Sequence, residues 1–235
     1  MTKRYFSTLL ILLLALSALM AKAQHASYCV GTQAGLAVPL GQFSSKDYSN
    51  GGYALSGTSY GLEGAWFWNG KWGIGVDVSA SSFAFSATDY VSAYKASEPA
   101  FTDVQMLSGP YIVRTYLGGA YYKVGICPEV GITFKAMAGL TRAWTPDQLF
   151  GVNSSEVGKL YFWKTRAYSA KMAVLCGANI EYKLFERVSL LLQTDFSYSE
   201  MAFVFAQGTA PNTVYNTKFL QLPVFNVQPG INVNF

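Results

Sequence analysis

The chain ends in residues 226–235, NVQPGINVNF, where apolar and polar residues alternate. One parity is apolar and holds Val227, Ile231, Val233 and Phe235. Successive side chains of a β-strand point to opposite faces, so a period of two predicts a strand with one apolar and one polar face. What each face contacts decides what such a strand is for, and the remainder of the sequence must supply that answer.

Seven more segments show the same alternation, and each is long enough to cross a bilayer as a tilted strand, for which about 9–11 residues suffice. They are residues 28–40, 55–68, 72–82, 105–117, 130–140, 168–182 and 188–198. An even number of strands lets both ends of the sheet lie on one side. Closure is required in lipid, because an open edge leaves backbone N–H and C=O groups unpaired. The sequence therefore predicts an all-β fold, an eight-stranded antiparallel up-and-down transmembrane β-barrel.

The connections between these segments alternate between short and long. Residues 69–71 and 185–187 are predicted to be three-residue turns, and a third turn falls within residues 118–129. The long connections are polar and cover residues 41–52, 86–103, 142–164 and 205–218. Short periplasmic turns and long extracellular loops are typical of outer-membrane barrels. The apolar parity of segment 105–117 is opposite to that of the two segments before it, which predicts a bulge or an odd connection there.

The amino-terminal end indicates export. Lys3 and Arg4 precede an apolar run over residues 6–20 and a small-residue motif at 21–23, the arrangement of a cleaved signal peptide. An uncleaved anchor helix is the alternative, but the run is short for a membrane span. We therefore predict a signal peptide at residues 1–23, a barrel domain at residues 24–235, and a location in the outer membrane of a Gram-negative cell.

The composition excludes several function classes. Charged residues make up 13% of the chain, against roughly 25% in ordinary soluble domains. Without the signal peptide, 14 Lys and Arg face 13 Asp and Glu, so no excess of positive charge favours nucleic acid. Cys29, Cys127 and Cys176 are an odd number without metal-ligand spacing. We predict no cofactor and no metal.

The polar faces consist mostly of small residues, which suits the filling of a narrow barrel better than a soluble surface. Trp66, Trp68 and Trp72 lie beside the turn at residues 69–71, where a periplasmic aromatic girdle is expected. These observations favour an apolar face that points outward to lipid. The alternative is a soluble lipocalin-like carrier with the two faces reversed.

Six isolated charges fall on the polar parity and are predicted to form a network inside the barrel: Glu63, Asp77, Arg114, Lys135, Lys171 and Asp195. The three-residue turn places Glu63 directly opposite Asp77, a repulsive pair that needs nearby cations. Arg114 is the expected partner, and the two lysines can reach across a narrow lumen. An eight-stranded barrel is filled by its own side chains, so we predict a plugged interior. A narrow pore for small solutes remains the alternative.

Residues 35–45, 51–64, 106–111, 135–140 and 228–235 resemble the small outer-membrane β-barrel proteins common in Bacteroidetes, which are similar to OmpA- and OmpX-type eight-stranded barrels. The resemblance covers nearly the whole predicted barrel domain. It implies that the terminal strand, with Phe235 and the apolar Val233 and Ile231, is read by the barrel-assembly machinery. These proteins share no uniform activity.

The sequence does not favour an enzyme. His25 is the only histidine, and it lies beside the predicted cleavage site, far from an outer rim where a lipid-modifying barrel would need its base. We instead predict a surface or structural role. The predicted partners are outer-membrane lipid and lipopolysaccharide, the assembly machinery and an extracellular ligand, but not nucleic acid. Aromatic residues in the long connections either contact such a ligand or pack together: Tyr48, Tyr90, Tyr94, Phe150, Tyr161, Trp163 and Tyr215.

Overall fold

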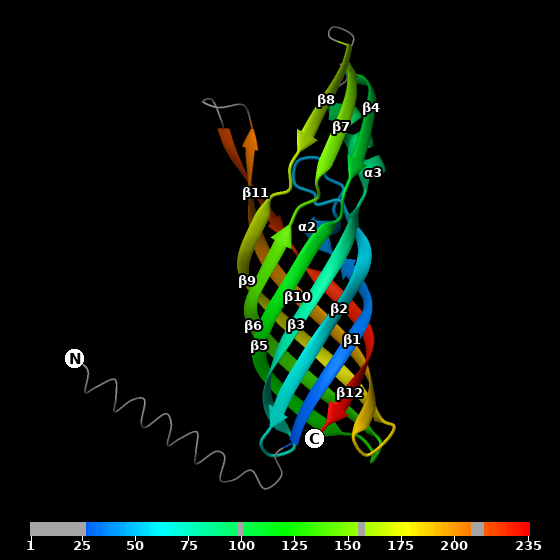
Figure 1. The fold of residues 1–235 in the computed structure, drawn as a ribbon, viewed down its shortest axis with the longest axis vertical. Coiled ribbons are helices and arrows are strands. Elements are labelled where there is room, and N and C mark those ends of the chain that lie inside the picture. Colours follow the sequence, from blue (N-terminus) through cyan, green and yellow to red (C-terminus); the bar gives the residue numbers. More distant parts are fainter. Residues whose placement is uncertain (1–26, 98–100, 155–157, 208–213) are drawn as a thin grey trace, which may run out of the picture.

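Eight antiparallel strands close into a barrel in the computed structural model, which describes residues 27–97, 101–154, 158–207 and 214–235 (Figure 1). The barrel strands are β1 (Ser27–Pro39), β2 (Ala54–Phe67), β3 (Trp72–Phe85), β5 (Tyr111–Gly125), β6 (Val130–Trp144), β9 (Tyr168–Lys183), β10 (Val188–Gln207) and β12 (Val224–Asn234). Each pairs with the next in chain order, and β12 pairs with β1. The predicted up-and-down eight-stranded barrel is confirmed. The predicted signal peptide lies outside the described residues.

The long connections carry more secondary structure than the sequence predicts. A separate three-stranded sheet of β4 (Phe101–Ser108), β7 (Gln148–Ser154) and β8 (Gly158–Lys164) stands above the barrel, at the end opposite the carboxy-terminus (Figure 1). β11 (Val214–Gln221) pairs antiparallel with the upper part of β10. The helices are α2 (Gly41–Ser44) and α3 (Ala87–Ser97). β7, β8 and β11 were not predicted, because none has a run of alternation long enough to span a bilayer, and β4 was predicted only in part, as the start of the segment at residues 105–117.

The short turns lie at the same end as the carboxy-terminus (Figure 1). Trp66 pairs with Ile74, so the odd-length turn at residues 69–71 is confirmed together with its register. The Asn69 side-chain oxygen closes this turn by accepting hydrogen bonds from the backbone N–H groups of Lys71 and Trp72 at 3.1 and 2.7 Å. No helix in the described part of the chain is long and apolar enough to cross a membrane.

The predicted strand at residues 105–117 is wrong. It breaks at Pro110, which cannot donate to a strand ladder, and the two pieces belong to different sheets. The barrel strand that follows runs on to Gly125, and the turn predicted within residues 118–129 lies at residues 126–129. Its inner face carries Val113 and Leu117, both buried, so the expected direction of this apolar face was reversed.

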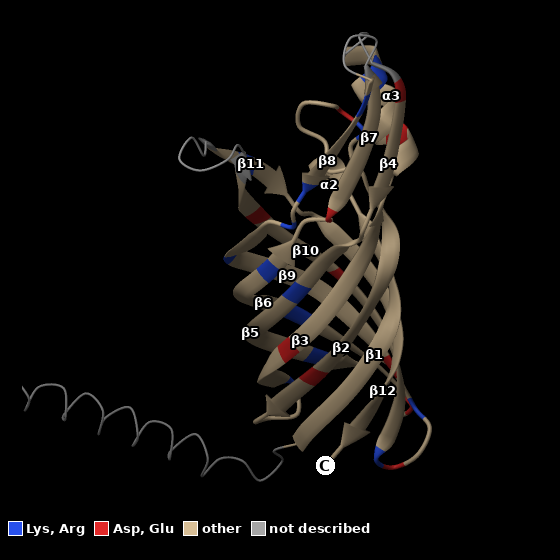
Figure 2. Cartoon of the chain, turned by 45° about the horizontal axis from the view of Figure 1, so that its top comes forward, with Lys and Arg blue, Asp and Glu red and all other residues tan. Residues whose placement is uncertain are grey.

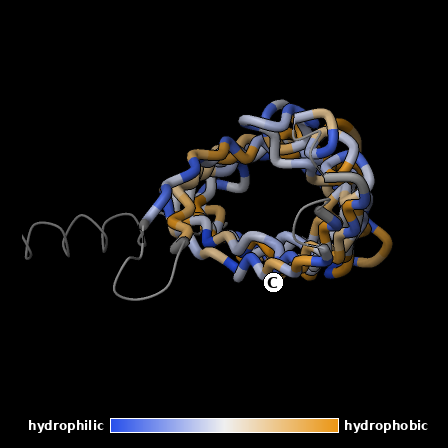
Figure 3. Tube along the Cα trace, turned by 90° about the horizontal axis from the view of Figure 1, so that it is seen from above, coloured by the Kyte–Doolittle hydropathy of each residue, from blue (hydrophilic) through white to orange (hydrophobic). Residues whose placement is uncertain are grey.

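The remaining barrel strands place their faces as predicted. Leu62 is 61% exposed and Val76 is 59% exposed on the outside, whereas the neighbouring Glu63 and Asp77 are 6% and 1% exposed. Seen from above, the strands form a closed ring in which hydrophilic and hydrophobic positions alternate along the tube (Figure 3). The barrel thus has an apolar outer surface and an interior in which charged and polar side chains lie between two buried apolar clusters.

Candidate functional site in the barrel interior

A single lysine holds three carboxylates together inside the barrel. The Lys135 Nζ lies 2.9 Å from Glu63 Oε2, 3.0 Å from Asp195 Oδ2 and 3.4 Å from Asp77 Oδ2. The lysine side chain is fully buried, and no carboxylate partner is more than 6% exposed. An ammonium has three donors, so this lysine can donate one charge-assisted hydrogen bond to each acid. The contacts cross-link β2, β3, β6 and β10 across the lumen; Figure 2 shows the charged positions along these strands.

Strand register positions these groups. The β2–β3 ladder pairs Glu63 with Asp77, as the turn length predicted. Gly177 on β9 pairs with Lys135 on one side and with Asp195 on the other. A Cβ atom at Gly177 would lie 1.9 Å from Asp195 Oδ1, so only glycine leaves room for this carboxylate to lean towards the lysine.

Amide side chains surround the charged cluster. The Asn179 Nδ2 donates to Glu63 Oε1 at 3.0 Å, and the Gln193 Nε2 donates to Asp195 Oδ2. The same Gln193 nitrogen lies 3.3 Å from Gln228 Oε1. Glu63 and Asp195 therefore each accept a hydrogen bond from a neutral amide as well as the contact with the lysine. These amides stabilise a cluster that carries more negative than positive charge.

Two predicted members do not join the cluster. Arg114 points outward, because the inner parity of β5 is the opposite of the predicted one, and its guanidinium lies 5.4 Å from the centre of the Trp144 ring. Lys171 has the inward parity, but β9 and β10 pair only up to Ala173 and Ser199, and the lysine lies exposed just beyond this point. Within the described residues, neither base forms an ion pair.

A second interior ion pair was missed. The Lys123 Nζ lies 2.7 Å from Glu181 Oε2, and the Thr133 hydroxyl donates to Glu181 Oε1 at 3.0 Å. Glu181 lies two residues after the inward-facing Asn179 on β9, so the alternation in the sequence was sufficient to predict that it faces inward. Lys123 falls within residues 118–129, where the sequence does not fix the position of the turn, so the strand pattern gives no inward direction for it.

Aromatic side chains pack together in the half of the barrel opposite the carboxy-terminus (Figure 1). Helix α2 turns Phe43 into the mouth, where its ring centre lies 5.0 Å from that of Phe83 and 5.1 Å from that of Tyr111. Phe43 and Phe83 are fully buried. The Tyr111 hydroxyl donates to the Gly52 carbonyl at 2.9 Å and so fixes the loop that follows α2.

The residues of the predicted girdle gather at the turn end. Trp66 lies 6.1 Å from Trp68 and Trp72 lies 4.6 Å from Tyr122, measured between ring centres. Trp72 is 49% exposed on the outer surface. The last strand also closes here, since the Phe235 N–H donates to the Tyr28 carbonyl at 2.8 Å. Ile231 points outward, and Val233 is half-buried on the same parity.

The aromatic residues of the long connections divide into two sets. Tyr48, Tyr90, Tyr94 and Phe150 pack together, with neighbouring ring centres 5.9–6.4 Å apart. The exposed set consists of Tyr161, Trp163 and Tyr215, of which Tyr161 is 71% exposed.

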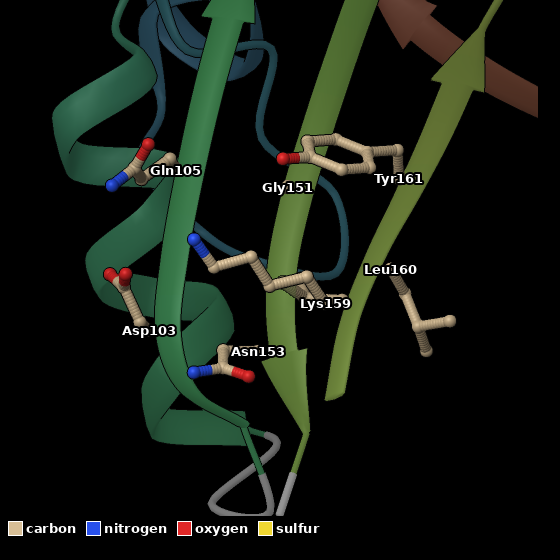
Figure 4. A pocket seen from close by; sticks show the side chains of 8 residues that line it. Asp103, Gln105, Gly151, Asn153, Lys159, Leu160 and Tyr161 are labelled. Atoms are coloured by element: carbon tan, nitrogen blue, oxygen red, sulfur yellow. The ribbon is translucent and has the colours of Figure 1, made fainter. Parts of the chain in front are cut away.

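A shallow hollow lies on the three-stranded sheet. Asp103, Lys159 and Asn153 line it, and the ring of Tyr161 covers Gly151 (Figure 4). In the described part of the chain, no group of three or more His, Cys, Asp or Glu side chains is arranged to hold a metal ion.

Comparisons with known proteins add structures but no family. No protein-family model matches the sequence, and no curated protein matches it. Among solved structures, the Yersinia pestis protein Ail, in complex with sucrose octasulfate, is 10% identical with a TM-score of 0.43, over 89% of this chain and 99% of that one. OprG from Pseudomonas aeruginosa is 12% identical with a TM-score of 0.46, over 89% and 96%. A major outer membrane protein from Thermus thermophilus is 10% identical with a TM-score of 0.46, over 90% and 100%.

Proposed function

We propose that the chain is an integral outer-membrane barrel with a closed lumen, which presents its upper sheet and loops for contacts outside the cell. The observation that carries this proposal is the alternation of faces around a closed ring of strands. Apolar side chains such as Leu62 and Val76 face outward, while Glu63, Asp77 and Lys135 face inward. A carrier of the lipocalin kind needs the opposite arrangement, with an apolar interior that receives its ligand.

The interior contacts support closure. Lys135 bridges strands from opposite parts of the barrel, and Phe43 fills the mouth above it. A solute that passes through must separate a buried lysine from three carboxylates, which leaves charges unpaired in a medium of low dielectric. We therefore assign the barrel a structural or surface-interaction role, with membrane lipid and lipopolysaccharide around its outer face and the barrel-assembly machinery as its partner during insertion.

One observation favours the second candidate, a narrow pore for small solutes. Several buried amides of the interior have a polar atom without a protein partner, among them Gln33, Asn179, Gln193 and Gln228. Buried polar atoms of this kind usually bind water. A chain of ordered water molecules past the charged cluster would give a conducting path.

Two experiments test the proposal in sequence. Outer-membrane fractionation, with gels of boiled and unboiled samples, should find a band in that fraction that shifts on boiling. A soluble periplasmic protein without a shift would contradict the membrane assignment. Planar-bilayer recording of the purified barrel should then show no steady unitary current, whereas steady currents would replace the closed barrel by the pore.

A further inference from the structure

A second cavity lies at the extracellular mouth, above the aromatic packing around Phe43. It has a volume of about 60 Å³, several times the room that one water molecule needs. Its walls come from parts of the chain that are distant in sequence: the loop before β2, the end of β8, the upper part of β10, and β11. Aromatic residues form much of the wall, including Tyr53, Tyr90 and Phe205.

Two lysines line this cavity, and none of the residues that line it is an acid. The Lys164 Nζ lies 4.4 Å from the centre of the Phe205 ring, and the Lys218 Nζ donates to the Gly51 carbonyl at 3.0 Å. Among the described residues, no carboxylate oxygen lies within 4.0 Å of either ammonium. Two positive charges thus share one cavity without an acidic partner in contact, which is unfavourable until an anion enters.

The titration of these lysines agrees with this geometry. Desolvation by the surrounding chain, and then the positive charge of Lys218, lower the pKa of Lys164 to about 8. Desolvation also lowers the pKa of Lys218, and the more distant carboxylate of Asp47 offsets part of this effect. Both shifts mean that the surrounding groups of the protein do not fully compensate the positive charge of the protonated lysines.

Two unpartnered polar atoms also belong to residues of the cavity wall. Tyr53 is 1% exposed, and its hydroxyl has no hydrogen-bond partner in the described structure. Gln148 is 5% exposed, and its Oε1 has none either. Burial raises the pKa of Tyr53, so the hydroxyl stays protonated and can donate a hydrogen bond. A buried donor that makes no hydrogen bond costs free energy, and a bound acceptor recovers this cost.

We propose that this cavity binds an oxyanion from outside the cell, with Lys164, Lys218 and Tyr53 as its donors. The class is a phosphate, sulfate or carboxylate group, because such groups accept several charge-assisted hydrogen bonds within a small volume. Gln148 offers an acceptor for a hydroxyl next to the anionic group, and the aromatic walls offer apolar contact for a ring. The oxyanion can therefore come free or on a saccharide. The inference deepens the proposed surface role and rests on it.

The test is a ligand titration of the folded barrel that is monitored by the amide signals in NMR spectra. The barrel is held in a polyoxyethylene detergent that contains neither sugar nor phosphate. The probes are inorganic phosphate, glucose 6-phosphate and glucose. Phosphate should give saturable shifts at residues around the cavity, and glucose should not. A tighter constant for glucose 6-phosphate than for phosphate identifies the saccharide-borne group, whereas equal constants identify a free anion.

Three variants should weaken phosphate binding: Lys164→Gln, Lys218→Gln and Tyr53→Phe. Each lysine change should cost about tenfold or more, as expected for a lost hydrogen bond to a charged group. Lys159→Gln is the matched control, since this lysine lies on the same strand β8 but lines the other hollow. It should leave the constant unchanged.

The outcomes separate the anion site from the barrel itself. A band that shifts on boiling shows in each variant that the barrel is folded before binding is measured. A folded barrel that binds no phosphate, binds glucose equally well, or binds phosphate unchanged in both lysine variants overturns the anion site and leaves the proposed function intact. A chain that shows no shift on boiling fails the proposed function, whatever it binds.

Discussion

Replacement of Lys135 by methionine is the sharpest perturbation of the barrel interior. Methionine keeps most of the apolar stem but removes the ammonium, which lies 2.9–3.4 Å from three carboxylates. At an effective dielectric constant of about 20, one such contact at ~3 Å is worth about 5 kcal/mol of attraction. Desolvation offsets most of this gain, and measured losses on breaking a buried pair are about 3–5 kcal/mol. We expect a loss at the upper end, because three acids lose the same partner.

The assay is denaturant unfolding in detergent micelles, with tryptophan fluorescence as the measured signal. Lys171→Met is the control, because that lysine is exposed and its loss should change stability by less than ~0.5 kcal/mol. Adding Asp195→Asn to Lys135→Met should restore part of the loss, since one fewer charge is left unpaired. A single Lys135 variant within about 1 kcal/mol of the wild type would refute the assignment of this lysine as the centre of the network.

Two further predictions concern other parts of the fold. Gly177→Ala should lower stability by about 1–3 kcal/mol in the same unfolding assay, because the new methyl group displaces the Asp195 carboxylate. Gly64→Ala is the control and should leave stability unchanged, because its methyl group meets only one backbone oxygen at 3.9 Å. Equal effects of the two changes would contradict the packing argument. A hydrogen bond from Ser86, and next the Lys46 ammonium, lower the pKa of Asp89, so this contact stabilises the fold above about pH 4 and is lost as the pH falls through the lowered pKa. Ser86→Ala should raise the Asp89 titration midpoint measured by NMR, and an unchanged midpoint would count against the contact.

The sequence predicted the barrel well because its strands obey one simple rule. A strand with lipid on one side and the barrel interior on the other must alternate along its whole length, and seven of the eight predicted segments each correspond to a single barrel strand. The odd-length turn at residues 69–71 then set the register that brings Glu63 opposite Asp77. Local pattern and turn length were sufficient for these conclusions.

The fourth segment shows where such reasoning fails. Alternation continues across Pro110, although the chain changes sheets there, so periodicity alone joined two strands and reversed one face. Arg114 was misplaced for that reason. The sequence placed Lys135 and Asp195 in one interior network, but it did not show that Gly177 on the strand between them pairs with both and leaves room for their contact. The cavity with Lys164 and Lys218 likewise depends on loops whose packing no local pattern encodes.

The most direct test of the central claim is a spin-label scan along β2 in lipid vesicles, in a background whose three native cysteines are replaced by serine. Collisional access to oxygen reports contact with the apolar bilayer. Labels at Tyr60 and Leu62 should show high oxygen access, and labels at Ser59 and Gly61 low access, which gives a period of two with its maxima on the outer face. The reverse phase, or an even profile without periodicity, would contradict a barrel that presents its apolar face to lipid.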